Sequence, residues 1–229
     1  MNHAAKQPAV PALFAWPPQG VVGRVLHKSK IYEHAKPTAA VRAMFVAQVE
    51  QIIWRYKLAP ETVNLSAKPG VPEIEVFEIA LKTSRLDEAV LRCIDKAIPF
   101  PILFELRFDG RIQPVAAYKR PSEADAGQWV VSDYFAAPWQ ADGGPREGLP
   151  VALDLRGLYE QLLRNLMPLP PRAGESLKDQ LERLGQWRSG HNETARLQTR
   201  LRQEKQFNRK VVLNAELRRV QQSVDQLAS

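Results

Sequence analysis

The stretch VPEIEVFEIALK, residues 71–82, decides the fold class that the sequence predicts, because its composition and its flanking Gly/Pro segments are typical of a strand. Its apolar residues alternate, but they switch from even to odd positions midway: Ile74 and Val76, then Phe77, Ile79 and Leu81. In a regular strand the two sets would lie on opposite faces. A bulge near Val76–Phe77 would let all five face one core. It would also place the charged residues on the opposite face: Glu73, Glu75, Glu78 and Lys82. The stretch therefore predicts a bulged, one-sided strand.

The segment before this strand predicts a long helix. Thr38 is suited to cap it, because a threonine hydroxyl accepts a backbone N–H bond at a helix start. Apolar residues then recur at helical spacing: Val41, Phe45, Val49, Ile52 and Tyr56. The helix is expected to run to Lys57 and to end before Pro60. Residues 28–34 predict a loop, and the Pro/Ala-rich residues 1–21 predict an irregular segment.

The segment after the strand predicts a helix and then a meander of strands. Ser84–Asp87 resembles a capping box that opens the helix. The stretch IPFPILFELRF, residues 98–108, is expected to lead into a strand, and residues 111–120 are expected to form the next one, joined to it by the hairpin signal Asp109–Gly110. Pro114 favours an edge position or a bulge for the second of them, since proline lacks the N–H of a central strand.

The remaining elements complete the predicted fold. Residues 128–135 predict a further strand, and Asp154 precedes a leucine-rich helix. The order helix, strand, helix, three strands, helix predicts an α+β fold with a small, mostly antiparallel sheet flanked by helices, followed by a C-terminal basic coiled-coil helix. The expected divisions are an irregular segment 1–21, an α+β domain 22–166, a proline-rich linker 167–176 and a helical coiled-coil tail 177–229.

The tail carries an apolar seam with alternating spacings of four and three, which is the a/d pattern of a coiled coil. Its members are Leu213, Leu217, Val220, Val224 and Leu227. Gly185 and Gly190 interrupt a similar pattern upstream, and from Asn192 onward one helix of about 35 residues, ~50 Å long, is expected. So narrow a seam needs a partner: a second copy of the chain, the 177–184 segment folded back, or another protein.

The net charge of +7 is concentrated in this tail. Residues 172–229 contain twelve basic and seven acidic residues, so their net charge is +5. Six cations are predicted to contact nucleic acid or a partner protein: Arg196, Arg200, Arg202, Lys205, Arg209 and Lys210. Phe207 is expected to pack with Val211 and Leu213 and so to anchor the helix. A localised basic excess favours DNA, bound without sequence specificity, although an acidic protein or simple solvation stays open.

A second basic segment lies near the N-terminus. Lys28, Lys30 and Tyr32 combine two cations with an aromatic ring, a combination that suits a nucleic-acid backbone. An ordinary basic loop with a half-buried tyrosine is the alternative.

Catalysis has little support in the sequence. The closest match to a restriction-type nuclease, which needs two carboxylates for Mg²⁺ and a lysine, is Asp95, Glu105 and Lys119. Arg107 stands where the lysine is expected, and an arginine cannot act as a base. The four histidines lack ligand spacing, and phosphate-binding glycine motifs are missing. The sequence therefore predicts no cofactor, no metal site and no catalytic residues, with a divergent metal-dependent nuclease as the alternative.

Composition also indicates the cellular compartment. No apolar run approaches the ~18 residues of a transmembrane helix, and no secretory signal is recognisable. The single cysteine, Cys93, lies in a helical pattern and is expected to be buried. These features predict a cytoplasmic protein without a membrane partner.

Several stretches, taken in order, resemble an uncharacterised bacterial family, a domain of unknown function. They are HKSKIYEHAKPT, WRYKLAPETVNL, PEIEVFEIALK, LRCIDKAIPFPILFEL, AAYKRP and EKQFNRKVVLNAELR. The resemblance implies genes placed beside methyltransferase and helicase genes of type III-like restriction and phage-defence clusters. It carries no active site. It implies an accessory subunit of an antiviral, restriction-modification-like protein complex, which bridges methyltransferase or helicase subunits or holds DNA for them. A structural homodimer through the tail is a separate alternative, which the apolar seam leaves open.

Overall fold

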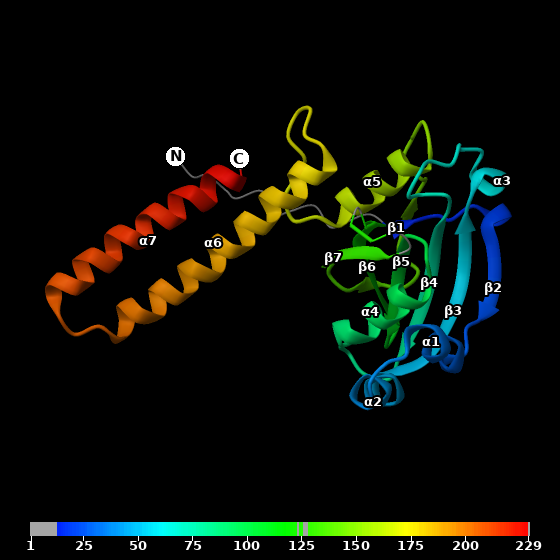
Figure 1. The fold of residues 1–229 in the computed structure, drawn as a ribbon, viewed down its shortest axis with the longest axis horizontal. Helices are drawn as coiled ribbons and strands as arrows, with labels where there is room; N and C mark the ends of the chain where they lie inside the picture. Colours follow the sequence, from blue (N-terminus) through cyan, green and yellow to red (C-terminus); the bar gives the residue numbers. More distant parts are fainter. Residues whose placement is uncertain (1–12, 123, 126–127, 229) are drawn as a thin grey trace. The chain divides into compact units, whose positions relative to one another are not determined.

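A computed structural model of the chain describes residues 13–122, 124–125 and 128–228. The chain divides into two compact units, of which the first ends at Pro168 and the second begins at Leu169. The first unit contains the sheet, and the second contains the two long C-terminal helices (Figure 1). The border lies inside the proline-rich segment 167–176.

The first unit is built on a seven-stranded sheet with the strand order β2-β3-β4-β5-β6-β7, and β8 also pairs with β6 (Figure 1). The strands are β2 (Val21–Val25), β3 (Val49–Leu58), β4 (Ile74–Leu81), β5 (Ile102–Phe108), β6 (Arg111–Pro121), β7 (Trp129–Ala136) and β8 (Gln140–Ala141). All neighbours are antiparallel except β4 and β5, which are parallel. The predicted α+β fold with a mostly antiparallel sheet is therefore confirmed.

Helices cover both faces of this sheet. They are α1 (Lys28–Ala35), α2 (Ala39–Gln48), α3 (Pro60–Val63), α4 (Glu88–Ala97) and α5 (Leu155–Leu166). Helices α1, α2 and α4 pack on the face that carries Phe77, Ile79 and Phe104, and Cys93 of α4 is buried there as predicted. Helix α5 meets the other face, where its Leu162 lies near Leu103. Burial on both faces explains why β4 is apolar on two parities.

The predicted strand 71–82 is confirmed as β4, but the bulge belongs to its neighbour. Trp54 pairs with Phe77 and Tyr56 pairs with Val76, so Arg55 of β3 is the extra residue. Strand β4 itself alternates regularly, and Glu75 lies on a buried face with 2% of its surface exposed. The expected charged face is thus wrong for Glu75, because both faces of the sheet are covered.

The long helix expected after Thr38 is wrong in its second half. The Thr38 hydroxyl caps α2 as predicted, by accepting from the N–H of Val41. Helix α2 ends at Gln48, and residues 49–58 form strand β3, paired with β2 and β4. The following cap also differs, because Asp87 rather than Ser84 opens α4. The helical pattern of residues 49–56 is local, whereas pairing with β2 and β4 decides that they form a strand.

Two expectations of irregular structure are corrected. Within the predicted irregular segment 1–21, Leu13–Phe14 form β1, which pairs in parallel with β9 (Arg146–Glu147), and Pro18–Gly20 form the 3₁₀ helix η1. Residues 1–12 of that segment lie outside the described residues. The predicted loop 28–34 is helix α1, and the residue that follows it, Lys36, has the left-handed conformation.

Pro114 lies in an interior strand, contrary to the edge or bulge that its chemistry favours. It is in register with Glu105 of β5 on one side, and β7 ends at Ala136 on the other. The N–H of Ala137 donates to the Pro114 carbonyl, and the side-chain amide of Gln113 donates to the Ala137 carbonyl at 2.7 Å. Gln113 thus supplies the hydrogen bond that proline cannot give, because proline has no N–H.

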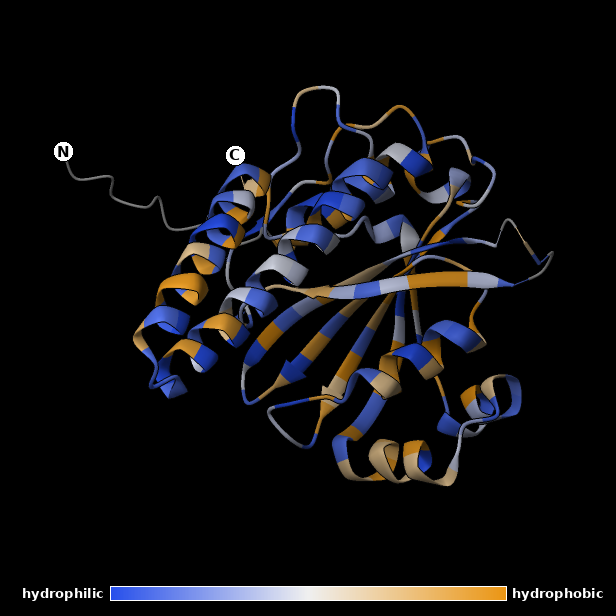
Figure 2. Ribbon diagram, turned by 60° about the vertical axis from the view of Figure 1, so that its left-hand side comes forward, coloured by the Kyte–Doolittle hydropathy of each residue, from blue (hydrophilic) through white to orange (hydrophobic). Residues whose placement is uncertain are grey.

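The second unit is a pair of helices, α6 (Leu177–Gln203) and α7 (Phe207–Ala228), joined by residues 204–206. They lie side by side and run in opposite directions (Figures 1 and 2). The single helix expected from Asn192 onward is therefore wrong: α6 continues through Gly185 and Gly190, and the break comes at Glu204. Of the three partners considered for the seam, the structure shows the upstream segment folded back.

The seam of α7 faces α6. Leu213 and Val224 are buried, and the other three seam residues are partly covered. A Cβ atom added at Gly190 would lie 2.5 Å from the Cγ2 of Val224, so the missing side chain allows the two helices to approach. Gly190 therefore assists the packing, whereas Gly185 has open space beside it.

Candidate nucleic-acid interface

The turn between α6 and α7 gathers the six cations that the sequence predicts as contacts. All six are exposed, and they occupy the last turns of α6, the connection and the first turn of α7: Arg196, Arg200, Arg202, Lys205, Arg209 and Lys210. We call this group the hairpin tip. A break in the helix that the sequence did not predict thus brings the cations before and after residue 204 around one turn.

Little acidic charge balances the hairpin tip. Arg196 pairs with Glu193 at 3.2 Å, and within the described part of the chain the other five cations form no ion pair. The Glu204 carboxylate accepts from the backbone N–H groups of Gln206 at 2.9 Å and Lys205 at 2.8 Å. The hydrogen bond from Gln206 is the largest influence lowering the pKa of Glu204, and the charges of Arg209 and Lys210 add to it. The carboxylate of Glu204 therefore binds the backbone just before α7 and, in the part of the chain that the structure describes, forms no ion pair with the cations of the hairpin tip.

The apolar residues of the hairpin tip are not where the sequence places them. Leu213 is buried as expected, but Phe207 and Val211 are exposed, and so is Val212. The prediction that Phe207 and Val211 anchor the helix is wrong, because the seam that meets α6 passes through Leu213 and leaves both of them on another side of α7.

The second predicted contact segment, in α1, is largely used inside the first unit. The ammonium group of Lys28 donates to the carbonyls of Phe45 at 3.1 Å and Val49 at 2.6 Å, at the end of α2. Burial is the main cause that lowers its pKa. The ring of Tyr32 packs edge-on against Phe45, and Lys30 pairs with Glu33. Only Lys30 remains at the surface.

A hollow of about 510 Å³ lies beside this segment and is lined by residues 25–29 and 50–52. It includes Lys28, whose ammonium group is already bonded to backbone carbonyls. Across the described ranges, no three His, Cys, Asp or Glu side chains are grouped so that they could hold a metal ion.

The three residues of the nuclease alternative are only partly brought together. Lys119 donates to the Asp95 carbonyl at 2.5 Å, to the Ile98 carbonyl, and to Asp95 Oδ1 at 3.3 Å. Tyr134 donates to the other carboxylate oxygen of Asp95. The Lys119 side chain is fully enclosed, so it binds the last carbonyls of α4 and fastens that helix to β6.

Burial shifts the pKa values of Asp95 and Lys119 in opposite directions. It raises the pKa of Asp95 and lowers the pKa of Lys119, and in each case the charge of the partner works against the shift. Glu105 lies on the other face of the sheet, because its neighbours Phe104 and Leu106 are the residues that face α4. The arrangement of Asp95 and Lys119 is that of a structural ion pair, and Glu105 is not part of it.

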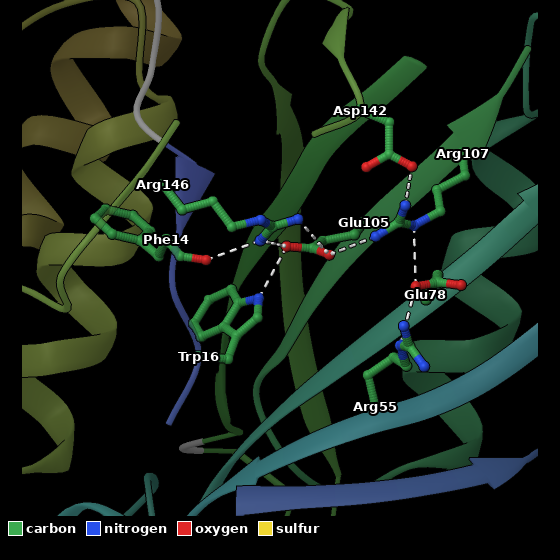
Figure 3. A network of polar contacts seen from close by, with 8 residues as sticks. All are labelled: Phe14, Trp16, Arg55, Glu78, Glu105, Arg107, Asp142 and Arg146. Carbon is green, nitrogen blue, oxygen red and sulfur yellow. Dashed lines mark hydrogen bonds and ion pairs between the residues drawn. The ribbon is translucent and has the colours of Figure 1, made fainter. Parts of the chain in front are cut away.

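Glu105 belongs to a chain of alternating charges on the sheet (Figure 3). Arg146 and the indole N–H of Trp16 both donate to Glu105 Oε1 at 2.8 Å. Glu78, which is in register with Glu105 on the adjacent parallel strand, pairs with Arg107 at 2.9 Å. Arg107 also pairs with Glu105 at 3.9 Å, and Asp142 branches from Arg107. Arg55, paired with Glu78, and Arg146 are the two ends of the chain. The network fastens the N-terminal segment and the 142–146 loop to the sheet.

One further carboxyl group has an unusual environment without belonging to any motif of the sequence. Glu75 accepts from the indole N–H of Trp54, and its backbone lies next to Ile102 of β5. Burial, followed by the nearby carboxylate of Glu73, raises the pKa of Glu75 to about 8. The only signal in the sequence is that Glu75 has the same parity as Phe77 and Ile79, which face the core.

The fold and the hairpin tip define a two-unit protein, in which an α+β domain precedes a helical hairpin with a cationic tip. The chain belongs to the family described as a domain of unknown function (DUF4391), whose model matches residues 14–224 and thus spans both units. The resemblance to an uncharacterised domain family is thereby confirmed. Neither the curated proteins nor the solved structures show a significant match to the chain. Within the described residues, no helix is both long and apolar enough to cross a lipid bilayer.

Proposed function

We propose that this protein is a non-catalytic accessory subunit of a restriction-modification-like antiphage defence complex, and that it binds DNA without sequence specificity through the hairpin tip. The observation that carries the proposal is the set of five exposed, unpaired cations around one turn of the described chain, with Glu204 as the only carboxylate among them. Such a surplus attracts a polyanion.

The chemistry of the tip favours phosphate over base contacts. Arginine and lysine side chains can meet phosphates along a strand, and these contacts position a protein without reading the base sequence. Residues 196–210 contain six cations and one carboxylate, which indicates an electrostatic, salt-dependent mode of binding.

The partner subunits belong to the proposal as well. The family resemblance implies a methyltransferase or a helicase as neighbour, and the first unit offers a folded domain for docking. In this arrangement the protein works in the cytoplasm, where it holds DNA for partners that perform the chemistry.

The proposal is tested by removing the charges of the tip. A variant with Arg202, Lys205, Arg209 and Lys210 all changed to Gln should bind duplex DNA more weakly, by a similar factor for unrelated sequences. The salt slope of binding should fall by roughly 0.9 for each phosphate that the variant no longer neutralises. The control carries the same change at four exposed cations that do not belong to the tip: Arg24, Lys36, Arg85 and Lys178.

The control variant should keep the parental affinity and slope. Equal affinity and slope for parent, control and tip variant would contradict a DNA-binding role. If the tip variant instead assembles poorly with its methyltransferase or helicase while DNA affinity is unchanged, the tip contacts a protein.

A further inference from the structure

The hairpin tip exposes an aromatic ring among its cations. Phe207, the first residue of α7, is 77% exposed, and Val211, one turn further, is 53% exposed. Lys205 and Arg209 lie two residues away from Phe207 on either side. Figure 2 shows hydrophobic colour in the first turns of α7 next to the hydrophilic connection. Such exposure forgoes the free energy that burial of an aromatic side chain would give.

The fold itself gives no use for this ring. The buried residues of α7 are Leu213 and Val224, and within the described residues Phe207 has no aromatic partner. The preceding residues are fixed, since the Glu204 carboxylate holds two backbone N–H groups of the turn. The ring therefore projects from an ordered turn.

We propose that the hairpin tip binds unpaired nucleic acid, with a base stacked on the ring of Phe207 and the adjoining phosphates on Lys205 and Arg209. This inference rests on the proposed function and specifies its substrate class. In a duplex both faces of each base are covered by neighbouring pairs, whereas an unpaired base has a free face for the ring. Base-on-aromatic stacking beside a cationic groove is the usual basis of sequence-tolerant single-strand binding.

The charge of the tip argues against a second copy of the chain as the occupant. Two tips facing each other would bring their cations together, and like charges at a contact oppose association. An anionic occupant has the complementary charge, and flat bases match an exposed ring. An acidic protein is the competing occupant, and the experiment separates it from nucleic acid.

The experiment compares the full-length protein with Phe207→Ala, Phe207→Leu and Phe207→Trp, using a labelled oligodeoxythymidine strand and a duplex of equal length. The parent should prefer the strand. Phe207→Ala should weaken strand binding roughly tenfold, and Phe207→Leu should weaken it too, because leucine has no π face. Phe207→Trp should retain it. Duplex affinity and the salt slope should stay unchanged in all three.

The neighbouring exposed residue provides a matched control. Val212→Ala removes apolar surface that is 66% exposed and should leave both affinities unchanged. Since both side chains are exposed, the melting temperatures of all variants should equal that of the parent, which excludes misfolding as a cause.

The outcomes separate the two proposals. If the charge-depleted tip variant fails to bind DNA while Phe207→Ala matches the parent on the strand, DNA binding stands and stacking is refuted. Equal reductions on strand and duplex, or full strand binding by Phe207→Leu, would also refute stacking. A parent that binds neither DNA would contradict both proposals. A reduction confined to capture of an acidic partner protein would assign Phe207 to a protein contact instead.

Discussion

Glu75 shows how a covered sheet changes the chemistry of one side chain. On a one-sided strand its carboxylate would be hydrated, but here it lies among apolar residues with Trp54 as its hydrogen-bond donor. Its pKa of about 8 is above the ordinary value of 4.5, so the folded protein keeps a proton that the unfolded chain loses. The free energy of unfolding should therefore fall as the pH rises from 4.5 to about 8.

The substitution Glu75→Gln tests this consequence. Glutamine preserves the shape and the acceptor for Trp54 and removes the titration, so the variant should lose most of this pH dependence. Above pH 8 it should be more stable than the parent by several kcal/mol, with an upper bound of about 5 kcal/mol, because the pKa rises from 4.5 to about 8 and each tenfold difference in proton affinity corresponds to roughly 1.4 kcal/mol. Denaturant unfolding between pH 5 and pH 9 measures the free energy of unfolding of both proteins.

The exposed Glu50 provides the control for this prediction. Glu50→Gln on β3 should retain the parental pH dependence. A Glu75→Gln protein whose stability still declines from pH 5 to pH 8 as the parent does would show that Glu75 is ionised in the fold.

Lys119 shows the limit of assigning roles to single residues from sequence. A lysine on the strand that follows Glu105 resembles a catalytic partner, yet the ammonium group of Lys119 donates to three acceptors at the end of α4. The partners are 24 positions apart in the chain. Arg146 and Glu105, 41 positions apart, are a second case. Such pairings depend on how strands and helices are brought together, and composition and spacing do not encode that directly.

Helix α6 contains two glycines with opposite consequences. Glycine inside a helix costs about 1 kcal/mol relative to alanine, so Gly185→Ala, with nothing within 4 Å of the new methyl group, should stabilise the hairpin by about that amount. Gly190→Ala should destabilise it, since the methyl group would meet Val224, whose branched side chain has one strongly preferred rotamer in a helix. Thermal unfolding followed by circular dichroism measures both.

A double variant checks the cause. Val224→Ala removes the methyl group that Gly190→Ala would strike, so the two changes together should be less destabilising than the sum of the single changes. If Gly190→Ala raises the melting temperature as much as Gly185→Ala does, the close approach of α6 and α7 at this point is wrong.

The elements differ in how well the sequence predicts them. Strands β4 to β7 and helices α4 and α5 are found within a few residues, because turns such as Asp109–Gly110 and caps such as Asp154 are local signals. The sequence of strand β3 predicts a helix instead, since the spacing of Val49, Ile52 and Tyr56 by three and four is helical. The strand accommodates this spacing through two register shifts, and only pairing with β2 and β4 decides for it. The cations of the hairpin tip are predicted from the sequence, because a basic residue is recognised by its type alone. Their gathering around the turn between α6 and α7 is not predicted, because it depends on where the helix breaks.

The two units make separate contributions to the proposed function, so a truncated chain should separate them. The core between the sheet and helices α1, α2 and α4 is formed by residues between Ile31 and Val115, and the hairpin supplies none of them. A chain ending at Pro168 should unfold in one cooperative transition and should no longer bind DNA. Near-ultraviolet circular dichroism and a binding titration check these expectations. An aggregated or unfolded truncation product would show that the first unit needs the hairpin.

The hydrogen bonds of Arg183 have a consequence for protein engineering. Its guanidinium group donates to the carbonyl of Pro170, where the hairpin begins, and to that of Leu227, where it ends, both at 2.8 Å. Arg172 reaches the carbonyl of Gln226 in the same way. Entry and exit of this unit are thus adjacent, as they are in modules that tolerate insertion into the loops of other proteins. We therefore expect residues 169–228 to fold when inserted into a loop of a host protein, with both junctions at a single site.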